Sequence, residues 1–137
     1  MSRDVLLDNE PVQALGDPGH AKHARVVSHV QVVAQRKRRA TPIRVITPTA
    51  VRVEAGWDRT APRWAFANRL RIRDDALDTT RANAAAGVRN AAGVSVADAH
   101  LGAAILSTSS AQVTVITGDP DDVRKAAGTR PVTVVAI

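Results

Sequence analysis

Short apolar runs along the chain alternate with segments in which apolar residues recur at helical spacing. The runs cover residues 5–7, 43–46, 113–116 and 131–137, and a shorter run lies near residues 70–72. Apolar runs without polar alternation are typical of strands that are buried on both faces of a sheet. We therefore expect five strands.

The segments between these runs carry the signals of helices. Apolar residues between positions 26 and 34 follow the period of one helix face, and the alanine-rich run 78–92 predicts a helix that stops at Gly93. Further helix starts are indicated by Pro11, by Thr47 as N-cap before Pro48, by the capping-box pair Ser95 and Asp98, and by Asp119 before Pro120. Strands and helices thus alternate along the chain.

This alternation predicts an α/β fold, a three-layer α/β/α sandwich with a central, mainly parallel sheet. No internal repeat, low-complexity tract or linker interrupts the sequence, so we expect one domain over residues 1–137. Because 45% of the residues are hydrophobic and only 2% are aromatic, the core must consist mainly of Val, Leu, Ile and Ala.

Composition narrows the classes of protein and of site. The net charge of +6 and the sequence pI of about 11.2 favour a polyanionic partner such as RNA. The chain has no cysteine, which excludes disulfides and thiolate metal sites. No apolar run is long enough for a membrane span or for the core of a signal peptide, so we expect a cytoplasmic protein without a membrane partner.

Acidic residues stand where the expected fold would gather them. Asp8 and Asp119 each follow a strand, and residues beyond the carboxyl ends of parallel strands meet at one edge of the sheet. Asp98 lies near a helix start, and Glu54 shares a helix face with Ala50 and Val51, so we expect that face to point inward. Together these four residues would form a ring of carboxylates.

Such a ring favours a hard divalent cation. Packed carboxylates raise one another's pKa unless a cation lies between them, and oxygen ligands suit Mg²⁺ or Mn²⁺. The sequence has no His and Cys set at zinc-ligand spacing. A metal ion held by carboxylates on a basic protein suggests hydrolysis of phosphodiester bonds by a metal-activated water.

Each acid also has a simpler structural interpretation. Asp119 would cap a helix whose first turn contains Asp121 and Asp122, and Asp98 would belong to an ordinary capping box. Asp8 would be a turn residue, and Glu54 a solvated helix residue. Capping and metal binding are compatible, so these interpretations remain open at this point.

Other polar and aromatic residues give weaker signals. The basic run at residues 36–39 is either a solvated helix end or a contact to the RNA backbone. The four histidines lack a nucleophile in a recognisable frame and are expected at the surface or in packing, with His100 at the site mouth as an alternative. Trp57, Trp64 and Phe66 are expected in a small core cluster or a partner-binding patch.

Four blocks of the sequence resemble, in order, those of PIN-domain ribonucleases, in particular VapC-type toxins of toxin–antitoxin pairs. They are VLLDNE, TPTAVRVEAGWDR, GVSVADAHLGAA and VITGDPDDVRKAAG, and the resemblance runs from about residue 4 to the C-terminus. It implies a PIN-like domain that binds Mg²⁺ or Mn²⁺ and cleaves RNA. It also implies a homodimer and a cognate antitoxin that covers the acidic cleft.

The resemblance assigns the family's metal-binding and catalytic acids to Asp8, Glu54, Asp98 and Asp119. Asp122 matches a further acid of the last block, and Thr117 matches its hydroxyl residue. Asn9 and Glu10 depart from the family's usual first block, which leaves open whether either of them contacts a metal ion.

This departure keeps a second function in view, a PIN-like module that binds RNA or an antitoxin without cleaving. A third possibility is a phosphoacceptor receiver domain, which also gathers acids at the ends of parallel strands. That fold requires a lysine directly after a late strand, whereas Lys125 lies within the expected last helix.

Overall fold

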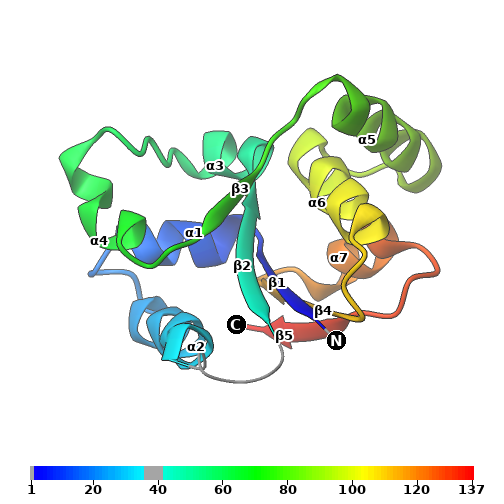
Figure 1. Cartoon of the computed structure of the whole chain (residues 1–137). Helices are drawn as coiled ribbons and strands as arrows, with labels where there is room; N and C mark the ends of the chain where they lie inside the picture. The colour runs from blue at the N-terminus through cyan, green and yellow to red at the C-terminus, as the bar shows by residue number, and fades with distance from the viewer. Residues whose placement is uncertain (1, 36–41) are drawn as a thin grey trace.

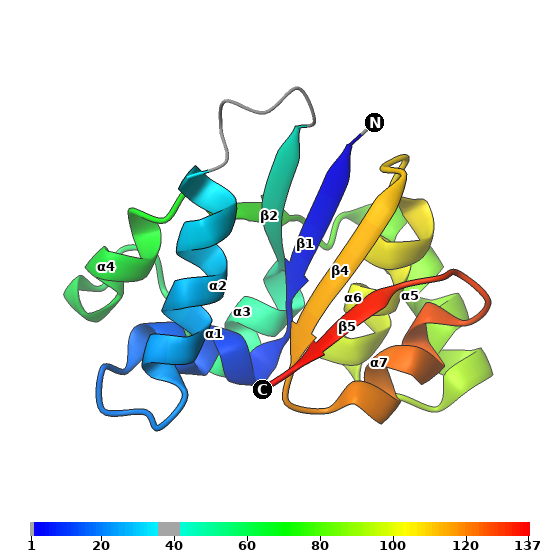
Figure 2. The same cartoon turned by 90° about the horizontal axis from the view of Figure 1, so that it is seen from below.

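The computed structural model describes residues 2–35 and 42–137, and it contains one all-parallel sheet of five strands (Figures 1 and 2). The strands are β1 Arg3–Leu7, β2 Ile43–Pro48, β3 Arg73–Asp75, β4 Gln112–Thr117 and β5 Thr133–Ala136. Their order across the sheet is β3-β2-β1-β4-β5, so β1 lies at the centre with β2 and β4 beside it. The predicted α/β class with a parallel central sheet is confirmed. The basic run at residues 36–39 lies outside the described residues.

Helices cover both faces of the sheet, which makes the structure a three-layer α/β/α sandwich. In Figure 2 the sheet separates α1, α2 and α4 from α5, α6 and α7. The bounds of the helices are α1 Asn9–Gly16, α2 His23–Gln35, α3 Thr49–Ala55, α4 Ala65–Asn68, α5 Thr79–Ala92, α6 Val96–Ser107 and α7 Pro120–Ala127, with a 3₁₀ turn η1 at Pro62–Trp64. None of the described helices is both long and apolar enough to cross a membrane.

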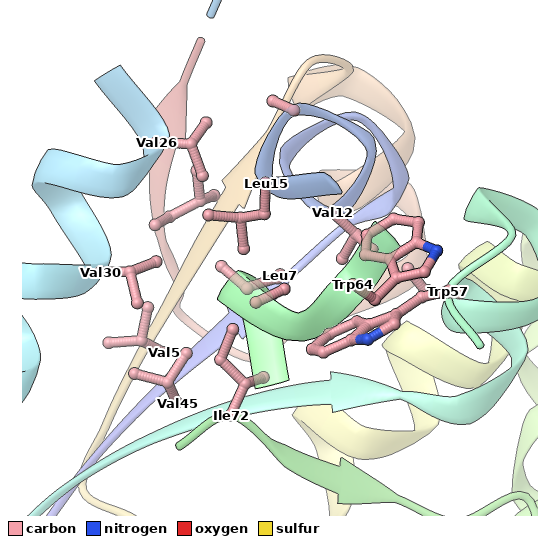
Figure 3. Packing of buried hydrophobic residues seen from close by; sticks show 14 of the residues in the cluster. Val5, Leu7, Val12, Leu15, Val26, Val30, Val45, Trp57, Trp64 and Ile72 are labelled. Carbon is pink, nitrogen blue, oxygen red and sulfur yellow. The ribbon is translucent and has the colours of Figure 1, made fainter. Parts of the chain in front are cut away.

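Alternate residues of β1 supply the two cores. Val5 and Leu7 pack on one face of the sheet with residues of α1 and α2, as Figure 3 shows. Leu6 belongs to the second core, which α6 and α7 form on the other face. Because successive strand residues point to opposite faces, an apolar run such as residues 5–7 is needed to fill both layers.

The two tryptophans close the first core, as the sequence predicted for a core cluster. Trp57 and Trp64 are 3% and 1% exposed, and their rings stack with centroids 5.6 Å apart (Figure 3). Trp64 packs directly on Gly16 at the end of α1, where a Cβ atom would overlap its ring. Phe66 lies at the edge of this region, with its ring centroid 5.9 Å from that of His23.

Two expectations about local structure are wrong. The strand expected near residues 70–72 lies instead at β3, which pairs with β2 from Arg73 onward. Ile72 packs in the first core but lies just before β3, so its apolar side chain indicates burial and not a place in the sheet. Thr47 is not the N-cap of α3, because β2 continues through Thr47 and Pro48 in its pairing with β3, and Pro48 then takes the cap position.

The ends of α5 and the start of α6 follow their local signals, whereas η1 and α4 were not expected from the sequence. Asp78 caps α5 by accepting a hydrogen bond from the Arg81 N–H at 2.8 Å, and Gly93 ends that helix in a left-handed conformation with φ 68°. Ser95 caps α6 by accepting from the Asp98 N–H at 3.1 Å. These ends were predictable because a cap depends only on residues within one turn.

Candidate functional site

The carboxyl ends of β1 and β4 lie side by side, and a cleft opens where they end. Leu7 pairs with Ile116 in the sheet, so Asp8 and the segment after Thr117 reach the same edge. The cleft has a volume of about 350 Å³. It is lined by Asp8, Asn9, Glu10, Glu54, Ser95, Asp98, Gly118, Asp119 and Asp122. The structure thus brings all five acids singled out in the sequence to one place, which we call the acidic cleft.

Asp8 is the most firmly held of these acids. It is only 6% exposed, and its Oδ1 accepts a hydrogen bond from the Asn9 N–H at 2.8 Å. Its Oδ2 accepts from the Thr117 hydroxyl at 2.7 Å, and the Thr117 Oγ1 in turn accepts from the Asp119 N–H at 2.9 Å. The fully buried Thr117 therefore ties the first acid to the last block of the sequence. Burial raises the pKa of Asp8, although the hydrogen bonds from Thr117 and Asn9 oppose that rise.

Capping and cleft formation occur together at Asp8 and Asp119. Asp8 is the N-cap of α1, and Asp119 is the N-cap of α7, where its Oδ1 accepts from the Asp122 N–H at 3.3 Å. The helix starts thereby hold these carboxylates at the sheet edge. The hydrogen bond with Asp119, burial and the Asp119 charge all raise the pKa of Asp122.

Both burial and the neighbouring acids disfavour the ionised form of Asp98. Burial first, and then the charge of Asp8, raise its pKa from the ordinary 3.8 to about 6. The charges of Asp122 and Glu54 act in the same direction, and a hydrogen bond with Ser95 acts against them. A carboxylate with a raised pKa among other acids is one that a cation would stabilise.

The expectation that Glu54 points inward is wrong. The residue is exposed, and its neighbour Val53 is 82% exposed, because the short helix α3 buries only Val51. Glu54 instead lies at the rim of the cleft, where its Oε1 accepts a hydrogen bond from the Asn9 Nδ2 at 3.0 Å. It is therefore a cleft residue that is held by α1 rather than by the core.

Asn9 and Glu10, which the sequence left open, both line the cleft. The Asn9 Oδ1 is buried and accepts no hydrogen bond among the described residues. Glu10 forms an ion pair with the Lys22 Nζ at 2.8 Å, and its carboxylate lies across Gly118, where a Cβ atom would overlap it. The sequence has no signal for the Glu10–Lys22 pair. Glu10 lies on α1 and Lys22 in the turn before α2, so the two residues meet only in the folded chain.

His100 does not lie at the mouth of the cleft. It is fully buried, its Nδ1 lies 3.3 Å from the Ala50 N–H, and its Nε2 lies 2.9 Å from the Asp75 Oδ2. Because the Ala50 N–H can only donate, the His100 Nδ1 is the acceptor of that hydrogen bond. The Nε2 therefore carries the proton and donates a hydrogen bond to Asp75. His100 therefore joins α3, β3 and α6 as a packing residue, in agreement with its expected structural role.

The donor set of the cleft suits a hard cation. Among the described residues, no three His, Cys, Asp or Glu side chains form a group ready to hold a metal ion. Mg²⁺ usually keeps several water ligands and binds one or two carboxylates directly. The oxygen-only donors, the raised pKa of Asp98 and the Asn9 Oδ1, which has no hydrogen-bond partner in the described part of the chain, fit an ion that is held partly through water.

No family model matches this chain, and no curated protein matches it either.

Proposed function

We propose that the chain is a Mg²⁺- or Mn²⁺-dependent endoribonuclease of the PIN-domain type, similar to VapC toxins. The observation that carries this proposal is the convergence on one cleft of the five predicted acids, which come from four separate segments of the chain. Burial and, after it, repulsion by neighbouring acids raise the pKa of Asp98, which supports a cation at this position. The net charge of the whole chain is +6 even with the acids of the cleft included, and this basic balance supports an RNA substrate.

In this proposal Asp8, Glu54, Asp98 and Asp119 hold the ion directly or through water. A bound Mg²⁺ would supply Lewis acidity that activates a water molecule and stabilises the charge developing on phosphate. Thr117 keeps Asp8 in place, and Asn9 keeps Glu54 in place, through the hydrogen bonds described above. Asp122 would contact the ion only through water, as an outer ligand. Lys22 neutralises the charge of Glu10 through their ion pair.

The proposed partners are a cognate antitoxin and a second copy of the chain, in the cytoplasm where RNA is available. An apolar patch next to the acidic cleft supports a protein partner. The patch consists of Ala50, Val53, Leu77, Val96 and Ala97, and it forms a hollow of about 470 Å³ that shares Glu54 with the cleft. Val53, Val96 and Leu77 are 82%, 56% and 38% exposed, which is unusual for apolar side chains so close together.

The proposal is tested with purified protein and a mixture of structured and single-stranded RNAs. The variants are Asp98→Asn and Asp119→Asn, and the matched control is Asp121→Asn, because Asp121 is 90% exposed and does not line the cleft. Wild type and control should cleave RNA at discrete sites with Mg²⁺ or Mn²⁺ and should be inactive with a chelator. Both cleft variants should lose at least about a hundredfold in rate, as expected when a group that stabilises the transition state is removed.

The proposal would be contradicted if the folded wild-type protein bound RNA but did not cleave it with either Mg²⁺ or Mn²⁺. That result would favour the binding module. Covalent phosphate on an aspartate after incubation with acetyl phosphate would favour the receiver interpretation. Equal cleavage by all variants would indicate a contaminating nuclease.

A further inference from the structure

A second cavity lies on the face of the sheet that α5 and α6 cover. It has a volume of about 350 Å³ and is lined by Asp4, Leu6, Arg44, Ile46, Arg73, Asp74, Asp75, Arg81, Ala104, Ser107, Thr108 and Ser109. We call it the arginine pocket. It shares no lining residue with the acidic cleft. Asp98 at the cleft and Ser107 at the pocket both belong to α6, and the nine-residue step between them corresponds to about 13.5 Å of helix.

The carboxylates of the arginine pocket are already satisfied. Asp4, which is 1% exposed, accepts two hydrogen bonds from Arg44 at 2.9 and 3.0 Å and further hydrogen bonds from Thr108 and Ser110. Asp75 accepts two from Arg81, both at 2.9 Å, and one from His100. These partners hold the pKa values of Asp4 and Asp75 below the ordinary range, although burial alone would raise them.

Asp74, the third acid of the pocket, accepts its hydrogen bonds from two arginines that do not line the pocket. Its Oδ2 accepts from Arg52 and its Oδ1 accepts from Arg59, each at 2.8 Å. Every carboxylate oxygen that lines the pocket thus accepts at least one hydrogen bond. The lining itself holds three arginines and three aspartates, and Arg52 and Arg59, which bind Asp74 from outside, give the region an excess of two positive charges.

Hydrogen-bond donors, in contrast, remain available in the pocket. Arg73 is exposed and has no ion pair or hydrogen bond among the described side chains. Arg44 uses its Nε and Nη2 for Asp4, which leaves its Nη1 unbonded within the part of the chain that the structure describes. Ser107, the last residue of α6, and Ser109 also line the pocket, and each carries a hydroxyl group. Positive charge, planar guanidinium donors and hydroxyls are the groups that recognise phosphate in proteins.

We propose that the arginine pocket is a binding site for a phosphate group, with Arg73 as its principal ligand and Arg44, Ser107 and Ser109 as further donors. The phosphate comes either from the backbone of an RNA strand or from a free nucleotide, and both sources use the same donors. The volume of the pocket is at the lower end of the range for small-ligand sites, which suits one phosphate with an attached sugar.

The test uses variants that leave the buried ion pairs intact. Arg73→Gln removes the cation that has no ion pair among the described residues, and Ser109→Asp places a negative charge at the pocket. Both residues are exposed. The matched control is Arg89→Gln, which removes the same charge from an exposed position on α5 outside the pocket. Inorganic phosphate is titrated into ¹⁵N-labelled protein at constant ionic strength and without divalent ions, and the amide signals of Arg73 and residues 107–109 are followed.

Wild type and Arg89→Gln should show saturable shifts of these signals. Arg73→Gln should weaken phosphate binding about tenfold to a hundredfold, the loss expected for one charge-assisted pair, and Ser109→Asp should abolish it. Shifts that do not saturate, or equal shifts in all four proteins, would overturn the proposal, because they would indicate general attraction to a basic protein.

Two further titrations distinguish the sources of the phosphate. A single-stranded RNA oligonucleotide that moves the same signals, and that binds Arg73→Gln more weakly than Arg89→Gln, would assign the pocket to the RNA backbone. Adenosine 5′-monophosphate moving these signals while the oligonucleotide leaves them unchanged would assign it to a nucleotide. Neither titration requires cleavage, so the arginine pocket and the proposed ribonuclease activity can fail separately.

Discussion

Replacing Asp98 by Asn should stabilise the metal-free protein at pH 8. At this pH the carboxylate of Asp98 is ionised, and its ionised form destabilises the fold, because burial and the neighbouring acids raise its pKa from 3.8 to about 6. At full strength this rise corresponds to roughly 3 kcal/mol. Solvent screens a half-buried group, and the variant also loses about 0.3–1 kcal/mol of favourable interaction with the start of α6. We therefore expect a net stabilisation of about 1–2 kcal/mol.

The pH dependence follows from the direction of the shift. Because the folded-state pKa of Asp98 lies above the unfolded value, the folded protein binds more protons between about pH 4 and pH 6. The contribution of Asp98 to stability therefore falls as the pH rises through this window and is constant above it. The difference between Asp98→Asn and wild type should be small near pH 4 and largest above pH 7.

The assay is urea unfolding in the presence of a chelator at pH 4.5 and pH 8, followed by the fluorescence of the buried Trp57 and Trp64. Asp121→Asn is the control, because its exposed side chain lies outside the cleft. Millimolar Mg²⁺ at pH 8 should stabilise the wild type more than Asp98→Asn, since a ligand stabilises the state that binds it. If Asp98→Asn were no more stable than wild type at pH 8 and the difference were the same at pH 4.5, the roles assigned to burial and repulsion would be refuted.

Two further substitutions test the packing and the hydrogen bonds that build the site. Gly16→Ala places a Cβ atom against the ring of Trp64 and should destabilise the protein by about 1–3 kcal/mol in urea unfolding; unchanged stability would mean that the contact yields without strain. Thr117→Val leaves a carboxylate oxygen of the buried Asp8 without its donor and should lower the free energy of unfolding by about 1–3 kcal/mol. The control is Thr114→Val, which should cost less because the Thr114 hydroxyl forms no hydrogen bond with a described residue. Equal losses would contradict the role of the Thr117 hydroxyl.

The acidic cleft was largely predictable because its geometry follows from a general rule. Strands of one parallel sheet end at one edge, so Asp8 and Asp119 were expected together once the runs before them were recognised as strands. The sequence did not indicate that β1 and β4 are neighbours, and this adjacency is what brings the two segments into contact. Glu54 reached the cleft for a different reason from the predicted one, through its hydrogen bond to Asn9 rather than through an inward-facing side of α3.

The sequence by itself determined four of the five strands, several helix ends and the identity of the acidic residues. These features depend on side chains within one or two turns of chain, where periodicity and capping act. Only the tertiary structure decided which charges are neutralised: Lys22 pairs with Glu10, Arg44 with the buried Asp4, and His100 with Asp75. Such pairs join residues 12 to 40 positions apart, and their formation depends on the order of strands and the packing of helices. For that reason the acidic cleft was visible in the sequence, whereas the arginine pocket appeared only in the folded chain.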